Sequence, residues 1–359
     1  MGRRGGATDG FSSAAGRNRA TAGRKIMIRV GVLGYGYWGP NIVRNFHAHE
    51  QSEVVLVCDK SLKAGERLRK AYPGIPFTAD ENEILHSTKI DAVCVITPVA
   101  SHYSLAKRAL ENGKHIFVEK PFTCNSAQAE ELVELADRKN LKIMVDHTFL
   151  FTGAVKKIRQ LVDEGALGRL FYYDSLRVNL GLFQHDVSVL WDLAPHDLSI
   201  MDYIIREKPE GVVAAAEKHL NEVEDIAFVS VYFPDRIIAH INVNWLSPVK
   251  VRTTLIGCEK KMLVWNDLDT NEKIKVYDKG VSISDGKGLH QLLVSYRSGD
   301  MWSPQIEQTE ALTEETAYFL ECILENKTPF NDGINGLRIV RILEAADKSI
   351  RNRGVAVNL

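Results

Sequence analysis

Short apolar runs and amphipathic stretches alternate along the first part of the chain. Mainly hydrophobic runs predict strands that are buried on both faces, at 28–33, 53–58, 90–97, 115–121 and 142–149. Apolar positions three and four residues apart predict the helices between them, at 39–49, 61–72, 101–112 and 126–139. Strands that alternate with helices are typical of a parallel sheet covered on both faces. We therefore predict an α/β fold whose first domain, 27–150, is a doubly wound Rossmann domain.

The pattern changes near residue 150. Alternating or β-branched segments predict strands at 170–179, 211–216, 225–233, 236–246, 250–257, 261–265 and 273–278. Helical periodicity occurs at 153–164, 189–205, 312–325 and 334–353. The short spacing of the strands predicts a second α/β domain, 151–359, built on a large and mostly antiparallel sheet. Because no glycine- or serine-rich linker separates the halves, we expect them to pack together with a cleft between them.

Composition and charge narrow the class of protein. A chain of 359 residues is longer than a single hydrophobic core usually accommodates, which agrees with two domains. The formal net charge of −1 gives no overall attraction to nucleic acid, and no apolar run approaches the ~20 residues that span a bilayer. Five dispersed cysteines without CxxC spacing favour a reducing compartment over a disulfide framework. We expect a cytoplasmic protein without nucleic-acid or membrane partners.

Residues 1–26 differ from the rest of the chain. They are rich in Gly, Ala, Arg and Ser and have almost no large apolar side chains, so they cannot bury enough surface to fold. We expect a disordered tail. The alternative is a start codon assigned too far upstream of Met27.

The stretch after the first predicted strand has the glycine spacing of a dinucleotide site. Gly34, Gly36 and Gly39 form a GxGxxG pattern that opens a helix, and Asp59 ends the next predicted strand. The first glycine allows a tight turn, the second lets the backbone approach a pyrophosphate, and the third lets the helix pack close to the sheet. The helix N-terminus adds free N–H groups and partial positive charge. The sequence therefore predicts an NAD site.

Neighbouring residues refine the expected cofactor. The Asp59 carboxylate can accept hydrogen bonds from ribose hydroxyls and would repel a 2′-phosphate, which favours NAD over NADP. Lys60 weakens this preference slightly, because a cation tolerates the phosphate. We expect Tyr37 and Trp38, between the second and third glycines, to flank the pyrophosphate or cover the nicotinamide side.

Two further strands end at the sheet edge where ligands bind in open α/β sheets. Thr97 and Pro98 close one strand, and His102 begins the next helix, where it either contacts the nicotinamide ribose or lies on the surface. Glu119 and Lys120 close the other strand. A lysine there is either a ligand to cofactor and substrate or a surface residue whose stem covers apolar neighbours.

These motifs occur together in one known family. GYGYWGPN, TPVASHYSLAKRAL, VEKP and WDLAPHD resemble the glucose–fructose oxidoreductase/inositol dehydrogenase/MocA (Gfo/Idh/MocA) family over residues 27–355. The resemblance implies NAD(P)-dependent chemistry at a sugar or cyclitol hydroxyl. It implies a Rossmann domain followed by a domain that binds substrate and packs homodimers or homotetramers. It also implies that Lys120, Asp192 and His196 correspond to the family's EKP lysine and Asp-x-x-x-His pair.

The reaction implied by the resemblance requires a proton acceptor. Hydride transfer from a carbinol carbon needs a group that takes the hydroxyl proton. His196 suits this role, and Lys120 is the alternative if burial near the positive nicotinamide lowers its pKa. We expect His196 to be the base and Lys120 to hold the substrate oxygen and share the proton. Asp192, one helical turn before His196, either orients the histidine or binds a hydroxyl.

Polar residues beside the WDLAPHD motif provide a candidate sugar-binding wall, with a solvated loop as the alternative. They are Arg177, Asn179, His185 and Asp186, of which we expect the first two to bind substrate.

A second candidate surface contains Trp245, Lys250 and Arg252. Strand alternation places Lys250 and Arg252 on one face. With Trp245 they either stack a base and pair with a phosphate or carboxylate, or build a subunit interface.

Metal chemistry is the alternative to nicotinamide chemistry. Zinc could be gathered by several residues, namely His147, His185, Asp192, His196 and Asp197. No HExxH motif or cysteine pair is present, and we expect no metal.

Two positions depart from the family's pattern and leave the substrate open. Thr152-Gly153 stands where relatives often have an Asn-Pro-like turn, and Asp146 stands where a small residue is common. The motifs look most similar to the branch that acts on nucleotide-linked amino sugars or their uronates, often at C3. An aminoglycoside, deoxysugar or cyclitol is the second substrate class. A non-catalytic NAD or sugar sensor is a different class of function.

Overall fold

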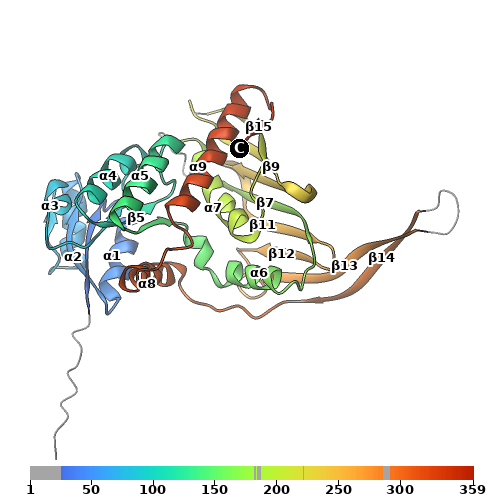
Figure 1. Cartoon of the computed structure of the whole chain (residues 1–359), viewed down its shortest axis with the longest axis horizontal. Helices are drawn as coiled ribbons and strands as arrows, with labels where there is room; N and C mark the ends of the chain where they lie inside the picture. Colours follow the sequence, from blue (N-terminus) through green and yellow to red (C-terminus); the bar gives the residue numbers. More distant parts are fainter. Residues whose placement is uncertain (1–25, 182, 184–186, 221, 286–291) are drawn as a thin grey trace, which may run out of the picture.

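Two sheets with their helices make up the computed structural model, which describes residues 26–181, 183, 187–220, 222–285 and 292–359 (Figure 1). Apart from Ile26, the tail expected at 1–26 lies outside the described residues. No helix of the described segments is long and apolar enough to cross a membrane.

The first sheet is parallel, as predicted, with the strand order β3-β2-β1-β4-β5-β6. Its strands are β1 (Ile28–Leu33), β2 (Ser52–Cys58), β3 (Phe77–Thr78), β4 (Ala92–Val95), β5 (His115–Glu119) and β6 (Ile143–Asp146). The intervening helices are α1 (Gly39–Ala48), α2 (Leu62–Ala71), α3 (Asn82–Leu85), α4 (His102–Glu111) and α5 (Ser126–Lys139). The strand order reverses between β1 and β4, so the loops after these strands diverge and leave a ligand site between them.

The second sheet has nine strands in the order β14-β13-β12-β11-β7-β10-β9-β8-β15. They are β7 (Leu170–Leu180), β8 (Gly211–Glu217), β9 (Ile226–Tyr232), β10 (Ile238–Asn244), β11 (Leu246–Cys258), β12 (Met262–Asn266), β13 (Ile274–Asp285), β14 (Leu292–Trp302) and β15 (Val357–Asn358). Among the described strands of this sheet, only the central β7–β10 pair is parallel, which confirms the prediction of a mostly antiparallel sheet. The β13–β14 hairpin extends away from the body of the molecule (Figure 1).

One face of the second sheet is covered by helices α6 (Gly153–Asp163), α7 (Val189–Ile204) and α9 (Gly333–Arg351) (Figure 1). Alternate residues such as Val229, Val231 and Ile241 point to this face and are fully buried. The residues between them, such as Phe228 and Ile238, point to the opposite face and are exposed. This is the period-two burial of a sheet with one covered face.

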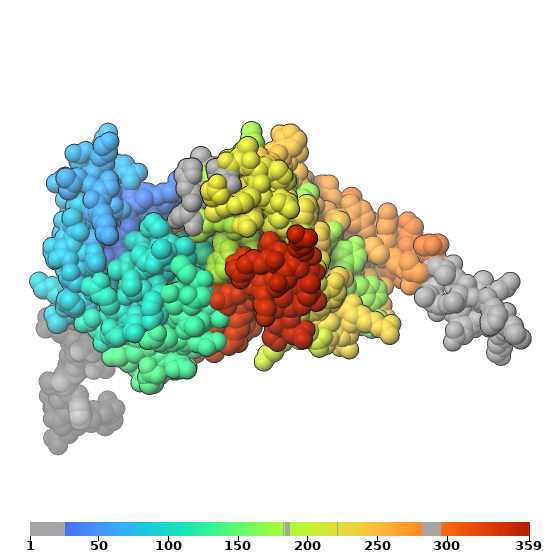
Figure 2. Space-filling view, turned by 90° about the horizontal axis from the view of Figure 1, so that it is seen from above, coloured from blue at the N-terminus to red at the C-terminus, as the bar shows by residue number. Residues whose placement is uncertain are grey.

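The C-terminal helices return to the first sheet. Helix α8 (Ala311–Leu324) packs on α1, and the ring of Phe319 lies 6.2 Å from that of Phe46 and 5.6 Å from that of Phe117. Helix α9 packs between α5 and β8 and is the red helix in the centre of Figure 2. Residues after 310 therefore contribute to the cores of both sheets.

Candidate active site

The glycine loop has the shape of a phosphate cradle. Gly34 has a φ of +102°, and a Cβ atom there would collide with the backbone oxygen of Ile96. A Cβ atom on Gly39 would collide with the backbone oxygen of Gly34, so the start of α1 lies against the loop. A Cβ atom on Gly36 would meet nothing within 4 Å. The protein's own packing thus excludes side chains at the first and third glycines, whereas the second faces open space. The approach of a pyrophosphate to Gly36 stays a prediction.

Two exposed aromatic residues stand at the start of α1. Tyr37 is 80% exposed and Trp38 is 42% exposed, and their rings meet edge to face at 5.6 Å. The first turn of α1 carries no acidic side chain, so the positive end of the helix is not neutralised there. This arrangement suits an anionic ligand covered by aromatic rings.

The Asp59 carboxylate is hydrogen-bonded to the glycine loop. Its Oδ2 atom accepts a hydrogen bond from the backbone N–H of Tyr35 at 2.6 Å, and its Oδ1 atom accepts one from Ser61 at 2.8 Å. Because each carboxylate oxygen has two acceptor positions, hydrogen bonds to ribose hydroxyls remain open. Lys60 is exposed. The sequence did not predict a role for Arg67. Its guanidinium donates to the backbone oxygen of Tyr35 at 2.6 Å and lies over the Tyr35 ring.

His102 links the ends of two strands of the first sheet. Its Nδ1 atom lies 2.9 Å from the Pro121 oxygen, and its Nε2 atom lies 2.7 Å from the Thr97 oxygen. Burial lowers its pKa, although the hydrogen bonds oppose that shift. His102 is therefore not the surface residue that was the alternative, and its contact with the nicotinamide ribose stays a prediction. Pro98 beside it is exposed.

Lys120 and Asp192 meet across the two halves of the chain. The Lys120 Nζ atom, at the end of β5, donates to the Asp192 backbone oxygen at 2.7 Å and to its Oδ1 atom at 3.1 Å. Asp192 lies in the first turn of α7, and both side chains are largely buried. In the described part of the chain, Nδ1 of His196 has no hydrogen-bond partner. Whether Asp192 orients His196 or binds a substrate hydroxyl stays a prediction.

Two neutral histidines lie beside the Lys120–Asp192 pair. Burial, followed by the positive charges of Lys120 and Arg177, holds the pKa of His196 well below its usual value. Burial and Lys120 lower the pKa of His147 to about 3. Neither ring nitrogen of His147 has a hydrogen-bond partner in the described part of the chain. Both rings are therefore uncharged at neutral pH, and a neutral imidazole can accept a proton.

Three carboxyl groups form a cluster behind Lys120. Glu119 and Asp146 are register partners at the ends of β5 and β6. Glu315, from α8, is fully buried. Its Oε1 atom accepts a hydrogen bond from Asn331 at 3.2 Å, and its Oε2 atom has no hydrogen-bond partner among the described residues. Burial and then the negative charge of Asp146 raise the pKa values of Glu119 and Glu315 well above normal. The Asp146 departure from the family pattern is thus part of a buried carboxyl cluster that the sequence did not predict. The expected contact of Glu119 with the cofactor stays a prediction.

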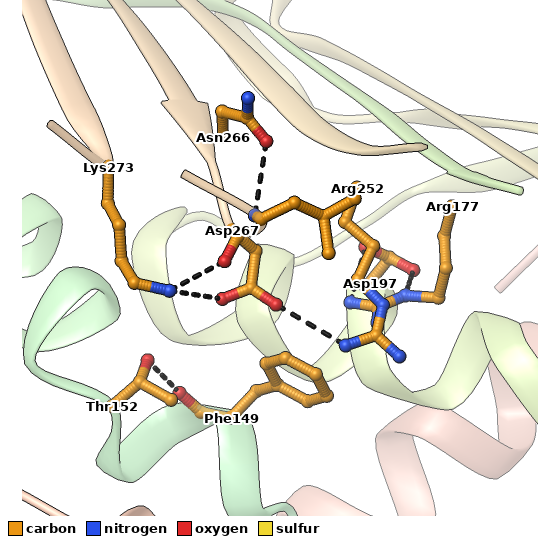
Figure 3. Close-up of polar contacts among 9 residues, drawn as sticks. Phe149, Thr152, Arg177, Asp197, Arg252, Asn266, Asp267 and Lys273 are labelled. Carbon is orange, nitrogen blue, oxygen red and sulfur yellow. Dashed lines mark hydrogen bonds and ion pairs between the residues drawn. The ribbon is translucent and has the colours of Figure 1, made fainter. Parts of the chain in front are cut away.

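The expected substrate ligand Arg177 is held by a second carboxylate. Its Nε atom donates to Oδ2 of Asp197 at 2.5 Å (Figure 3). Oδ1 of Asp197 accepts a hydrogen bond from the Ser175 hydroxyl at 2.6 Å. The Arg177 guanidinium lies 4.5 Å from the centre of the Phe149 ring. Asn179, two residues further along β7, is partly buried. Whether Arg177 and Asn179 touch substrate stays a prediction.

Other candidates separate into core, surface and undescribed residues. Trp245 is 1% exposed and packs on Phe183 at 5.5 Å, so it is a core residue and cannot stack a base. Lys250 is exposed. His185 and Asp186 lie outside the described residues. In the described ranges, no three His, Cys, Asp or Glu side chains are arranged to hold a metal ion.

Thr152 caps helix α6. Its hydroxyl donates to the Phe149 oxygen at 2.7 Å and accepts from the Val155 N–H at 3.4 Å. A Cβ atom on Gly153 would collide with the backbone of Glu307. The Thr-Gly departure therefore allows the chain before α8 to pass closely over the start of α6.

A phosphate cradle at the switch point of a parallel sheet, with a lysine at the end of a neighbouring strand, defines a nicotinamide-dependent oxidoreductase. The family model described as "Oxidoreductase family, NAD-binding Rossmann fold" matches residues 28–147, and the "GFO/IDH/MocA C-terminal domain" model matches residues 155–264. Together they cover more than half of the chain, which belongs to the Gfo/Idh/MocA family of oxidoreductases. The resemblance noted from the sequence is confirmed, and NAD is the cofactor.

Individual relatives are distant but nearly full-length. The chain is 24% identical to UDP-N-acetylglucosamine 3-dehydrogenase of Acidithiobacillus ferrooxidans, over 88% of this chain and 95% of that protein. It is 24% identical to the NAD-dependent scyllo-inositol 2-dehydrogenase of Bacillus subtilis, over 94% of this chain and 96% of that protein. The solved structure of GenD2 from gentamicin A biosynthesis, in complex with NAD, superposes with a TM-score of 0.78 at 19% identity, covering 93% of this chain and 97% of that one. Similarity at this level shows the shared fold and leaves the substrate open.

Proposed function

We propose that this chain oxidises a ring hydroxyl, at C3, of a nucleotide-linked sugar or amino-sugar uronate. The observation that carries the proposal is the Lys120–Asp192 ion pair beside the neutral His196 ring. A fixed cation and an uncharged base at one place are what removal of a hydroxyl proton requires. The UDP-sugar 3-dehydrogenase among the relatives supports the substrate class.

The glycine loop would hold the cofactor. Gly34, Gly36 and the start of α1 would take the pyrophosphate, and Asp59 would bind the adenosine ribose. Bound there, NAD supplies a nicotinamide ring that accepts a hydride. Tyr37 and Trp38 would cover the loop and exclude water from it.

Lys120 and His196 would together remove the proton of the substrate hydroxyl. The Lys120 ammonium, fixed by Asp192, donates a hydrogen bond to the substrate hydroxyl oxygen and orients it. The imidazole of His196 takes the hydroxyl proton as the carbinol carbon loses its hydride, which leaves a ketone and a protonated histidine. The protonated ring then passes its proton to solvent. In the reverse direction the same two groups would protonate a keto sugar.

A turnover assay tests this function. The purified full-length chain is mixed with NAD and each of a panel of compounds, while the absorbance of NADH is followed. The panel contains UDP-sugars, UDP-sugar uronates, inositols and aminoglycosides; the last are included because the NAD complex from gentamicin A biosynthesis has the same fold. NADH formation with a UDP-linked sugar, and much less with inositols, supports the proposal. Tight NAD binding without turnover on any member would make the chain a sensor and contradict the enzyme function.

The exposed face of the second sheet is our proposed contact between copies of the chain. Outward side chains of its central strands include large apolar residues, namely Tyr172, Phe228, Tyr232, Ile238 and Leu255. Their size and clustering on one uncovered face are typical of a self-association surface. We expect light scattering after size exclusion to give a dimer or tetramer mass, and Ile238→Asp to shift it toward the monomer. A monomeric wild-type chain at micromolar concentration would contradict this assignment.

A further inference from the structure

The Phe149 ring connects the proton-accepting histidine to two arginines. It lies 5.1 Å from the His196 ring. The Arg177 and Arg252 guanidinium groups lie 4.5 Å and 5.7 Å from the centre of the Phe149 ring, and Figure 3 shows both arginines beside the ring. Two cations therefore share one aromatic ring next to the reacting centre. Cation–π contacts stabilise this packing, but they do not cancel the repulsion between the two charges.

The two arginines are direct neighbours in the second sheet. Arg252 of β11 is the register partner of Arg177 of β7. Like charges directly opposite each other destabilise a sheet. The buried guanidinium of Arg177 donates two hydrogen bonds to the Asp197 carboxylate, which offsets the repulsion between the two arginines. Arg177 is thus neutralised within the protein.

The charge of Arg252 is only partly compensated. Its Nη1 atom lies 3.4 Å from Oδ2 of Asp267, and this is its ion pair in the described part of the chain. Asp267 is shared, because the Lys273 ammonium donates to its backbone oxygen at 2.6 Å and approaches its Oδ1 atom at 3.5 Å (Figure 3). Three cations therefore surround two carboxylates, and most of the five N–H donors of Arg252 are not directed at Asp267.

The two partly compensated cations, Arg252 and Lys273, are reachable from solvent. The side chains of Arg252 and Lys273 are 33% and 30% exposed, whereas that of Arg177 is 6% exposed. A planar guanidinium presents paired N–H groups that match the oxygens of carboxylates and phosphates. An anionic group bound here would balance the excess positive charge around Phe149. It would lie beside the sugar ring held by His196.

We propose that Arg252, supported by Lys273, forms a subsite for anionic oxygens of the substrate. This inference rests on the proposed function, because it places the reacting ring at Lys120 and His196. The subsite selects a sugar that carries a negative charge close to the oxidised ring. Two groups have this chemistry, the carboxylate of a uronate and the diphosphate of a nucleotide-linked sugar.

Direct binding tests the subsite without requiring turnover. Full-length protein with saturating NADH is titrated calorimetrically with D-glucose, D-glucuronate, UDP-glucose and UDP-glucuronate. Tighter binding of D-glucuronate than of D-glucose identifies the carboxylate as the recognised group. Equal binding of these two, with tighter binding of both UDP compounds, identifies the diphosphate.

Variants then assign the charge preference to Arg252. Arg252→Gln should weaken the preferred charged compound by about tenfold to a hundredfold, which is the effect of losing one charge-assisted contact. The affinity for D-glucose should not change. Lys273→Gln, which leaves the ring contact of Arg252 in place, should weaken the same compound to a smaller extent. Arg138→Gln removes the same charge from exposed helix α5 and serves as the matched control.

Several results would overturn the subsite. One is wild-type protein that binds charged and neutral sugars equally, or binds no charged compound. Another is an Arg252→Gln variant that keeps the wild-type affinities. Failure of the proposed function has a different signature, because charge-dependent binding would then persist without NADH formation on any sugar.

Discussion

The Nζ atom of Lys120 lies 2.7 Å from the backbone oxygen and 3.1 Å from the carboxylate of Asp192. One residue ends a strand of the first sheet and the other begins a helix of the second half. The pair therefore fixes a cation at the junction of the two halves, next to His196. Its removal should affect the chemistry more than the fold or the binding of cofactor.

Lys120→Ala should lower turnover by about 10²- to 10⁴-fold, because the substrate oxygen loses its hydrogen-bond donor. NADH binding, followed by fluorescence, should change little, since the glycine loop and Asp59 are intact. Lys139→Ala on the exposed end of α5 is the control and should keep the wild-type rate. A near-normal rate for Lys120→Ala would remove it from the mechanism.

The pH dependence of kcat/KM should reveal the state of His196. Its pKa is held below the usual value of about 6.5, so the ring is a neutral base at all higher pH values. Activity should fall only when the pH drops well below 6.5, because the ring is then protonated before substrate binds. The measurement is kcat/KM from about pH 5 to about pH 10. A rise in activity above neutral pH instead would contradict the assignment of His196 as the base.

Alanine at two glycines should separate folding from cofactor binding. Gly34→Ala should cost at least about 1–3 kcal/mol of unfolding free energy, because φ is +102° and the new Cβ meets the Ile96 oxygen. Gly36→Ala has space in the free protein, so the melting temperature without cofactor should not change. The new methyl group would occupy the pyrophosphate position and weaken NADH binding by about tenfold or more. Wild-type NADH affinity for Gly36→Ala would show that the phosphates lie elsewhere.

Glu315→Gln should make stability less dependent on pH. The folded-state pKa of Glu315 is raised above its ordinary value of about 4.5, so the folded protein binds a proton that the unfolded chain releases as the pH rises. The stability contributed by this proton is present at low pH and is lost as the pH rises from about 4.5 toward the folded pKa. A neutral amide of nearly the same shape does not titrate, so this linkage is removed.

Thermal melts between about pH 5 and about pH 8 test this linkage. The melting temperature of Glu315→Gln should fall less with rising pH than that of the wild type. Glu222→Gln, whose side chain is 99% exposed, is the matched control and should follow the wild type. Parallel curves for Glu315→Gln and the wild type would show that Glu315 is ionised in the folded protein. His147 contributes with the opposite sign, because its pKa of about 3 makes the folded state lose stability as the pH falls below about 6.5.

Local patterns predicted most elements but not all of them. The buried strands of the first sheet, such as β4, are continuous apolar runs and were found within a few residues. Strand β14 was missed, because Arg297, Gly299 and Asp300 interrupt the alternation of apolar and polar residues. It forms by antiparallel pairing with β13. Strand β3 and helix α3 are too short to show a period. Short strands and hairpin arms depend on pairing with distant segments, which a periodicity does not record.

The residues of the candidate site also divide into those that the sequence predicted and those that it did not. Gly34, Gly36, Gly39 and Asp59 were recognisable because their spacing along the chain is itself the structural requirement. Lys120 was recognisable because it ends a predicted strand. The roles of Phe149, Asp197, Asp267 and Glu315 were not, since each acts on a residue brought near it by packing. An ordinary aspartate or phenylalanine carries no local signal of such a contact.

By itself, the sequence determined the parallel sheet, the phosphate cradle and the class of chemistry, because each depends on residues that are close along the chain or on one element's periodicity. Only the tertiary structure decided which carboxylates neutralise which cations, which histidines are buried without charge, and where a positive charge is only partly compensated. Those properties are set by burial and by distances between strands and helices far apart in sequence. The local dielectric environment and the sum of neighbouring charges exist only in the folded chain.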